Sequence, residues 1–129
     1  MRCLIVDDDT ICRKAVGLVL EEVALCDDAV NGSEAVAKFT EALQMEEPYD
    51  VIILDILMPG IDGHDTARRI RQVEKELTGG THVKIIMLSV LNSVNDAMEA
   101  FCYAQSTAYM VKPVSEDKLL NSFKQLGLL

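Results

Sequence analysis

DVIILDILMPGIDG, residues Asp50–Gly63, holds an apolar run, Val51–Leu54, that no polar residue interrupts. Such a run is typical of a strand buried on both faces of a parallel sheet. The run ends at Asp55, and Pro59 and two glycines require a loop before any helix can begin. An aspartate at this strand end points into the crevice where open α/β sheets bind ligands. The alternative is a loop aspartate that caps the next helix, and this segment alone leaves both readings open.

The rest of the chain alternates apolar and amphipathic segments. Strands are expected at Arg2–Val6, Ala24–Val30, Val51–Leu54, Val83–Leu88 and Ala108–Val111. Helices are expected after Asp9 or Thr10, from Ser33 to about Leu43, from near His64, after Asn92 or Ser93, and after Ser115. Their predicted core faces include Ile11, Ala15, Leu18, Val19 and Val23 in the first helix, and Ala67, Ile70, Val73 and Leu77 in the third. Five strands alternating with five helices predict an α/β fold, a parallel sheet covered on both faces.

Composition limits the functional classes. The 129 residues suit one domain, 1–129, and no effector domain is expected. Half of the residues are hydrophobic and 5% are aromatic, which predicts an aliphatic core. A net charge of -9 argues against nucleic acid as a partner, because phosphates would repel this surface.

The four cysteines, Cys3, Cys12, Cys26 and Cys102, form no C-x-x-C pair, and no histidine cluster completes a zinc site. Each lies in an apolar segment, so buried reduced thiols are expected. No signal peptide or membrane-spanning run is recognised, which predicts a cytoplasmic protein without a membrane partner.

Polar residues follow four of the expected strands: Asp7 and Asp8, Asp55, Ser89, and Lys112. The carboxyl ends of parallel strands share one edge of the sheet, so these side chains should gather there. Crowded carboxylates repel one another unless something positive lies among them, and Mg²⁺ prefers oxygen ligands. One carboxylate oxygen would stay free to attack phosphorus, with Lys112 balancing the charge on the transferred group.

Four motifs carry a family resemblance: LIVDDD at residues 4–9, DILMPGIDG at 55–63, MLS at 87–89 and YMVKP at 109–113. In this order and at these intervals they are specific. The chain resembles a receiver domain of a two-component response regulator, stand-alone and similar to the chemotaxis regulator. This resemblance implies a flavodoxin-like sheet of strand order 2-1-3-4-5.

The resemblance also implies a phosphorylation chemistry. Asp55 would accept a phosphoryl group from a phosphohistidine on a sensor histidine kinase or a phosphotransfer protein. Asp8, Asp55 and the backbone carbonyl of Leu57 would bind Mg²⁺, with Mn²⁺ as an alternative, and Asp7 would help through water. Such a protein catalyses only its own phosphorylation and dephosphorylation, so it is not expected to be a conventional enzyme.

The remaining implied roles concern signal output. Lys112 would pair with the phosphoryl oxygens, Ser89 would move to hydrogen-bond them, and Tyr109 would follow Ser89 inward. This motion would change a surface made by the fourth helix, the fifth strand and the fifth helix, which would bind a downstream protein. The residues also allow structural readings: Ser89 as a helix cap, Tyr109 as a static aromatic residue, and His64 and His82 as ordinary surface residues.

Some positions depart from the receiver pattern. Val90 stands where many receivers have a small residue, and its bulk would narrow access to Asp55. Ala104-Gln105-Ser106 lacks the glycine that often precedes the fifth strand. Leu57 and Leu91 flank the implied phosphoryl position, and we hypothesise that these apolar side chains hinder an attacking water and lengthen the lifetime of the phosphoaspartate.

Two other functions remain open on sequence. A phosphohydrolase of the haloacid dehalogenase type would use Asp7 as nucleophile and Asp9 as acid, with Val83–Ser89 as second motif and Lys112 as its lysine. That reading gives Asp55 no role, and the acidic pair that this family carries in a Gly-Asp motif does not follow Lys112. A phosphorylation-independent adaptor would retain the fold alone, against which the intact polar strand ends argue.

Overall fold

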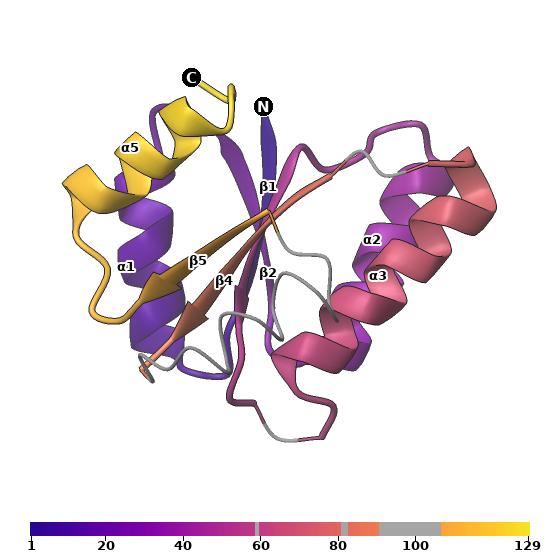
Figure 1. Ribbon diagram of the computed structural model, residues 1–129, viewed down its shortest axis with the longest axis horizontal. Coiled ribbons are helices and arrows are strands. Elements are labelled where there is room, and N and C mark those ends of the chain that lie inside the picture. Colours follow the sequence, from indigo (N-terminus) through magenta and orange to yellow (C-terminus); the bar gives the residue numbers. More distant parts are fainter. Residues whose placement is uncertain (59, 81–82, 91–106) are drawn as a thin grey trace.

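The computed structural model describes residues 1–58, 60–80, 83–90 and 107–129. Its five strands form one sheet, in which all neighbours are parallel and the order is β2-β1-β3-β4-β5 (Figure 1). They are β1 (Arg2–Val6), β2 (Leu25–Ala29), β3 (Val51–Asp55), β4 (Lys84–Ser89) and β5 (Ala108–Val111). The predicted α/β fold and its strand order are confirmed.

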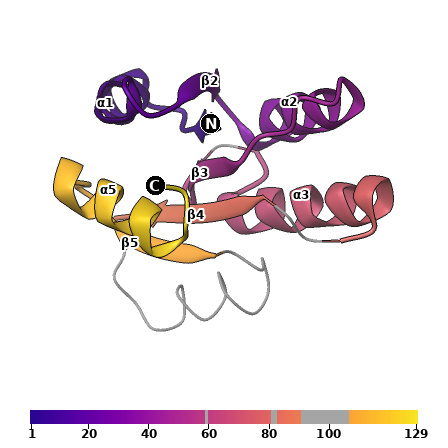
Figure 2. The ribbon, with the colours of Figure 1, turned by 90° about the horizontal axis from the view of Figure 1, so that it is seen from above.

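Helices cover both faces of the sheet. The described helices are α1 (Thr10–Leu20), α2 (Gly32–Gln44), α3 (Gly63–Thr78) and α5 (Glu116–Gln125). Figures 1 and 2 show α1 and α5 on one side of the strands and α2 and α3 on the other. The helix expected after Asn92 or Ser93 lies outside the described residues. Among the helices described, none is long and apolar enough to cross a bilayer.

The central strand β3 divides two hydrophobic clusters, because successive side chains of a strand point to opposite faces. One cluster lies under α1 and α5 and includes Cys3, Ile5, Val16, Leu20, Ile53, Leu119 and Phe123. The other lies under α2 and α3 and includes Leu4, Phe39, Ile52, Leu54, Ala67 and Ile70. All five residues of β3 are buried, as its uninterrupted apolar run predicted.

The helix starts follow local capping chemistry. Asp9 accepts a hydrogen bond from the Ile11 N–H, and Ser115 likewise caps α5, so both predicted caps are confirmed. The predicted cap Ser33 was wrong: α2 begins at Gly32, and its cap is Asn31, which accepts from the Glu34 N–H. Asparagine is as good a cap as serine, and sequence order alone does not decide between candidates two residues apart.

The predicted core face of α1 was partly wrong. Ile11 and Leu18 are 78% and 71% exposed, whereas Val16 and Leu20 are buried. Leu77 of α3 is exposed as well. Apolar residues surround most of α1, so its periodicity permits two overlapping stripes, and packing against the sheet selects one of them.

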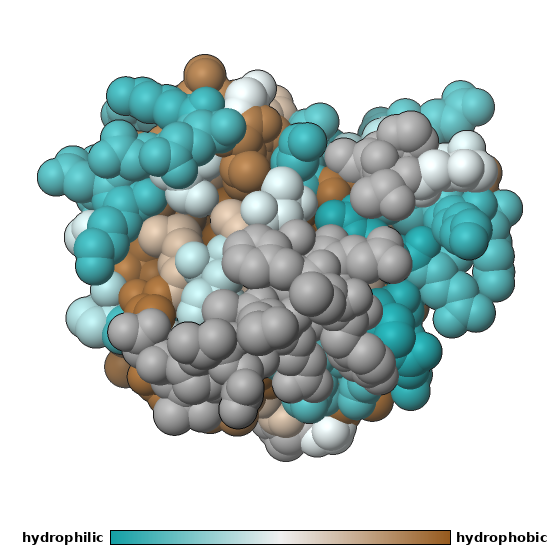
Figure 3. Space-filling model, in the orientation of Figure 1, coloured by the Kyte–Doolittle hydropathy of each residue, from teal (hydrophilic) through white to brown (hydrophobic). Residues whose placement is uncertain are grey.

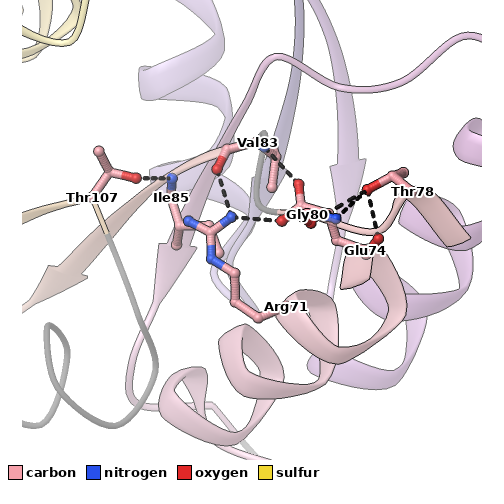
Figure 4. A network of polar contacts seen from close by, with 7 residues as sticks. All are labelled: Arg71, Glu74, Thr78, Gly80, Val83, Ile85 and Thr107. Atoms are coloured by element: carbon pink, nitrogen blue, oxygen red, sulfur yellow. Dashed lines mark hydrogen bonds and ion pairs between the residues drawn. The ribbon is translucent and has the colours of Figure 1, made fainter. Parts of the chain in front are cut away.

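A buried polar network joins the end of α3 to the start of β4 (Figure 4). The Glu74 carboxylate accepts hydrogen bonds from the Val83 N–H, at 2.6 Å, and from Arg71 Nη1, at 3.0 Å. Arg71 Nη1 also donates to the Val83 carbonyl, at 2.7 Å. These bonds satisfy backbone groups that the entry to β4 would otherwise bury without partners.

The outward faces of α3 and α5 are mainly hydrophilic, as Figure 3 shows at the right and upper left. Exposed polar residues there include Arg68, Arg69, Gln72, Glu76, Glu116, Asp117 and Lys124. The edge strand β2 carries exposed Asp27 and Asp28, charges of the kind that discourage pairing with another sheet.

Candidate functional site

Three carboxylates meet at the carboxyl edge of the sheet. Asp7 and Asp8 follow β1, and Asp55 ends the neighbouring strand β3. One oxygen from each carboxylate lies within 4.8 Å of the other two. Asp7 and Asp55 are buried and Asp8 is exposed, so the cluster opens to solvent on the Asp8 side. These hard oxygen donors suit Mg²⁺, which takes one or two protein carboxylates and keeps several waters.

Lys112 brings a positive charge from the end of β5 into this cluster. Its Nζ lies 2.9 Å from Asp7 Oδ2 and 3.4 Å from Asp55 Oδ1. Burial lowers the pKa of Lys112, but the hydrogen bond to Asp7 and the nearby Asp55 charge outweigh burial and raise it overall. Lys112 is therefore a charged ammonium beside both buried carboxylates.

Asp55 is a buried carboxylate whose charge Lys112 compensates only in part. Its side chain is almost fully buried, with the residue only 6% exposed. Burial, followed by the charge of Asp7, raises the pKa of Asp55 to about 6, although Lys112 acts in the opposite direction. A divalent cation among the three carboxylates would remove this repulsion, so the donor set fits a metal ion.

Main-chain hydrogen bonds hold the strand ends in place. The Ile56 N–H donates to the Leu88 carbonyl at 3.0 Å, and the Lys112 N–H donates to the Ser89 carbonyl at 2.7 Å. Ser89 ends β4 beside Asp55 and is 1% exposed. The serine and the lysine are therefore tied to each other and to the strand that carries Asp55.

A close approach explains the glycine that starts α3. A Cβ atom on Gly63 would lie 2.5 Å from the Asp55 carbonyl oxygen and 2.6 Å from the Ile56 Cα. The Gly63 N–H donates to the Ile56 carbonyl at 2.8 Å. Gly63 therefore lets the helix start directly against the backbone of the acceptor strand, a role beyond the loop signal read from the sequence.

The other predicted site residues are placed as follows. The Leu57 side chain is 55% exposed in the loop after Asp55, and Val90 is also exposed. Tyr109, on β5, is half-buried and packs against the cluster under α2 and α3. Leu91 and residues 104–106 lie outside the described residues, as does His82.

Arg13 is a site residue that the sequence analysis missed. Its Nη1 donates to the Asp7 carbonyl at 2.6 Å, and its Nε lies 3.7 Å from Asp28 Oδ2 at the end of β2. The Asp9 N–H donates to Asp7 Oδ1 at 2.9 Å. Arg13 therefore holds the peptide between Asp7 and Asp8. A basic residue six positions after Asp7, at the start of the helix, was the available signal.

His64 was wrongly predicted to be a surface residue. It is 4% exposed, in the first turn of α3. Nothing in the sequence indicated this burial, because His64 is polar and lies beside a predicted loop. The burial results from the close approach of α3 to β3 at the neighbouring Gly63.

The family comparison decides the class. The family model described as "Response regulator receiver domain" matches residues 3–124, nearly the whole chain. The chain belongs to the response regulator receiver domain family. Receiver domains act in two-component signal transduction, where they interact with histidine kinases or phosphotransfer proteins, and they are not classical enzymes. The phosphohydrolase alternative finds no support.

Relatives and solved structures agree with this assignment. The transcriptional regulatory protein ResD of Bacillus subtilis is 37% identical over 126 residues, 97% of this chain and 47% of ResD, so the chain spans about half of that relative. The response regulator TrrA of Thermotoga maritima, solved with Mg²⁺ and BeF, is 35% identical with a TM-score of 0.77, covering 99% of this chain and 98% of TrrA.

A third similar structure is a receiver domain that belongs to a histidine kinase. The receiver domain of the histidine kinase CKI1 from Arabidopsis thaliana, solved with Mg²⁺ and BeF₃⁻, is 28% identical with a TM-score of 0.83. It covers 98% of this chain and 89% of that chain. This receiver is therefore similar to domains found both in response regulators and in kinases.

Proposed function

We propose that Asp55 accepts a phosphoryl group from a phosphohistidine on a histidine kinase or a phosphotransfer protein. The observation that carries this proposal is the convergence of three carboxylates and Lys112, whose Nζ lies 3.4 Å from Asp55 Oδ1. Asp8, Asp55 and the Leu57 carbonyl would hold Mg²⁺ or Mn²⁺, with Asp7 contributing through water. The bound cation would neutralise charge on the phosphoryl oxygens during in-line transfer.

The hydrogen bonds distinguish the acceptor from its neighbour. Both oxygens of Asp7 are engaged, Oδ1 by the Asp9 N–H and Oδ2 by Lys112, each at 2.9 Å. Among the described residues, Asp55 has one longer contact, to Lys112 at 3.4 Å, and burial and the nearby Asp7 charge raise its pKa. A carboxylate with fewer and longer polar contacts keeps its lone pairs available for attack, so Asp55 is the proposed nucleophile.

Lys112 and Ser89 have supporting roles in this proposal. Lys112 offers a positive charge on the side of Asp55 Oδ1, where it can pair with oxygens of the incoming phosphoryl group. Ser89 ends the adjacent strand and can donate its hydroxyl to the same group. Tyr109, two residues before the end of β5, would follow Ser89 inward and change the surface around β5 and α5, where a downstream protein would bind.

The proposed output is protein binding. The exposed acidic residues Glu116 and Asp117 begin α5, and with a net charge of -9 this surface would favour a basic protein segment over nucleic acid. Leu57 and Leu91 are proposed to tune the lifetime of the phosphoaspartate by limiting the access of water. A cytoplasmic location stays a prediction from the sequence.

The experiment is phosphorylation by acetyl phosphate with Mg²⁺, followed by intact-mass spectrometry. The wild-type chain should gain one phosphate, and chelation with EDTA should prevent the gain. Asp55→Asn should gain none, whereas the matched control Asp117→Asn, on exposed α5, should behave as wild type. Phosphate uptake by Asp55→Asn at the wild-type rate would refute the proposed acceptor.

A further inference from the structure

Two cysteines that are distant in sequence are register partners in the sheet. Cys3 on β1 pairs with Cys26 on β2 in the parallel ladder. Paired residues of parallel strands project from the same face, and both side chains belong to the cluster under α1 and α5. Cys3 is fully buried, Cys26 is half-buried on the edge strand, and both are free thiols.

The spacing of the two strands suits a covalent bond. Neighbouring strands lie about 4.8 Å apart, which falls within the Cα separation of about 4.4–6.8 Å found in disulfides. Because β2 is the edge strand of the described sheet, paired there with β1 alone, it can shift toward β1 with less disturbance than a central strand. The same adjustment at a central strand would disturb packing on both sides.

The two thiols differ in acidity in a way that separates their roles. A hydrogen bond with Cys3 lowers the pKa of Cys26, whereas the same contact and burial raise the pKa of Cys3. The thiolate is the reactive form of cysteine. Cys26 is half-buried on the edge strand, whereas Cys3 is fully buried, so Cys26 is the thiol that an oxidant from solvent reaches and Cys3 is the second thiol.

We propose that Cys3 and Cys26 form a redox site in which a hydroperoxide oxidises the pair to a disulfide between β1 and β2. The Cys26 thiolate attacks the terminal peroxide oxygen, the O–O bond breaks, and an alcohol or water leaves as Cys26 becomes a sulfenic acid. The Cys3 sulfur then attacks the sulfenic sulfur and loses its proton, the S–O bond breaks, and water leaves. Two electrons pass from the two thiols to the peroxide, and a dithiol reductant reverses the change.

Cys12 provides an internal contrast. It is also half-buried, but its Sγ lies 3.4 Å from Asp9 Oδ2. Burial and the hydrogen bond to Asp9 raise the pKa of Cys12. It lies on α1, outside the strand ladder that pairs Cys3 with Cys26. Cys12 should therefore stay reduced under conditions that oxidise Cys26.

The redox site and the acceptor site are separate. Cys3 precedes Asp7 by four residues along β1, about 13 Å at the rise of a strand. The disulfide would tie β2 to β1 at the opposite end from the carboxylates, so it would stabilise the edge strand without occupying the acceptor. The inference does not rest on the proposed phosphorylation, and its test uses thiol chemistry alone.

The test uses the full chain with Cys12→Ser and Cys102→Ser, so that Cys3 and Cys26 are the remaining thiols. After treatment with hydrogen peroxide and alkylation under denaturing conditions, neither cysteine should take up the label, and a non-reducing digest should yield one peptide pair linked through Cys3 and Cys26. Dithiothreitol should restore both thiols. Adding Cys3→Ser should instead leave a Cys26 sulfenic acid that dimedone traps.

Three outcomes would overturn the proposal. They are a Cys26 sulfinic acid with Cys3 still open to alkylation, a disulfide-linked dimer in place of the internal bond, and peroxide consumption that Cys26→Ser leaves unchanged. A urea unfolding curve of the reduced variant establishes that it folds before oxidation. The oxidised form should then unfold at a higher urea concentration than the reduced form.

Discussion

At the scale of single residues, the site clusters carboxylates that suit cation and phosphoryl binding but lower the stability of the fold. Asp7, Asp8 and Asp55 place three negative charges within a few ångströms of one another, and Lys112 contributes one positive charge. The raised pKa of Asp55 reports first the cost of burying this charge and then its repulsion by Asp7. The fold tolerates this cost because the same arrangement accepts a cation and a phosphoryl group.

Replacing the acceptor should therefore stabilise the metal-free chain. The pKa of Asp55 rises from 3.8 to about 6 on folding, so the native state binds its proton more tightly than the unfolded state. Stability should then fall as pH rises through this window and stay lower above it. Asp55→Asn should remove that fall and gain up to about 3 kcal/mol at pH 7, since one pKa unit corresponds to about 1.4 kcal/mol.

Urea unfolding between pH 4 and pH 8 in EDTA checks this prediction. Glu76→Gln, which removes one exposed charge far from the cluster, is the matched control and should leave the pH profile unchanged. An Asp55→Asn variant that is less stable than wild type at pH 7 would show that the carboxylates are not under strain.

Arg13 should act on metal affinity through the backbone. Arg13→Lys keeps the charge but cannot hold the Asp7 carbonyl and Asp28 at once, so the Asp7–Asp8 turn loses a fixed position. We expect Mg²⁺ affinity to drop by roughly tenfold, the lower end of the range for residues that orient metal ligands. Isothermal titration calorimetry with Mg²⁺ measures this affinity, and Lys14→Arg, at the exposed residue next to Arg13, is the control. Equal Mg²⁺ affinities in the two variants would exclude this role for Arg13.

At the scale of elements, short contacts between helix starts and strand ends hold the site together. α3 begins directly against the end of β3, because Gly63 has no Cβ to meet the Asp55 carbonyl. The other end of α3 is joined to β4 by Arg71 and Glu74 (Figure 4). The helix thus braces two of the strands whose ends form the site.

Gly63→Ala should be strongly destabilising. Its Cβ would approach backbone atoms to within 2.6 Å, and backbone cannot move aside as a side-chain tip can. We expect a loss of about 2–4 kcal/mol in urea unfolding. Gly17→Ala, inside α1, is the matched control, because its Cβ would meet the Ile5 Cδ1 at an ordinary contact distance of 3.9 Å. This variant should be more stable than wild type by up to about 1 kcal/mol. Similar values for both variants would contradict the close approach.

The α3–β4 network gives a second prediction at this scale. Glu74→Ala would leave the Arg71 guanidinium buried without its carboxylate and the Val83 N–H without its acceptor. We expect a loss of about 3 kcal/mol or more in thermal or urea unfolding. Glu76→Ala, exposed on the same helix, should change stability by less than about 0.5 kcal/mol. A loss in Glu74→Ala as small as in this control would mean that the network contributes little.

At the scale of the whole molecule, the sequence predicted the strands and the polar residues at their ends, which follow from the order of residues along the chain. It missed which side chains are buried where helices pack against the sheet. The apolar runs ending in Asp7, Asp55 and Lys112 were sufficient for a parallel sheet with polar residues at one edge. The exposed Ile11 and the buried His64 were not foreseeable, because each depends on which face meets the sheet.

The same distinction applies to the candidate site. The motifs led to the carboxylates and the lysine, because these residues end strands. Arg13 and the Cys3–Cys26 pair were missed, since one acts through a backbone carbonyl and the other depends on strand register. Strand register leaves no pattern in a single sequence, and the basic residue at the start of the first helix did not by itself indicate that it binds the Asp7 carbonyl.

Phosphoryl transfer to this receiver should modify one particular aspartate, Asp55. The most direct measurement is a site map after transfer from a phosphohistidine protein in Mg²⁺: borohydride reduces the acyl phosphate to homoserine, and tandem mass spectrometry locates the converted residue. The account predicts homoserine at position 55 and nowhere else. Homoserine at position 7 or 8, with Asp55 intact, would contradict it.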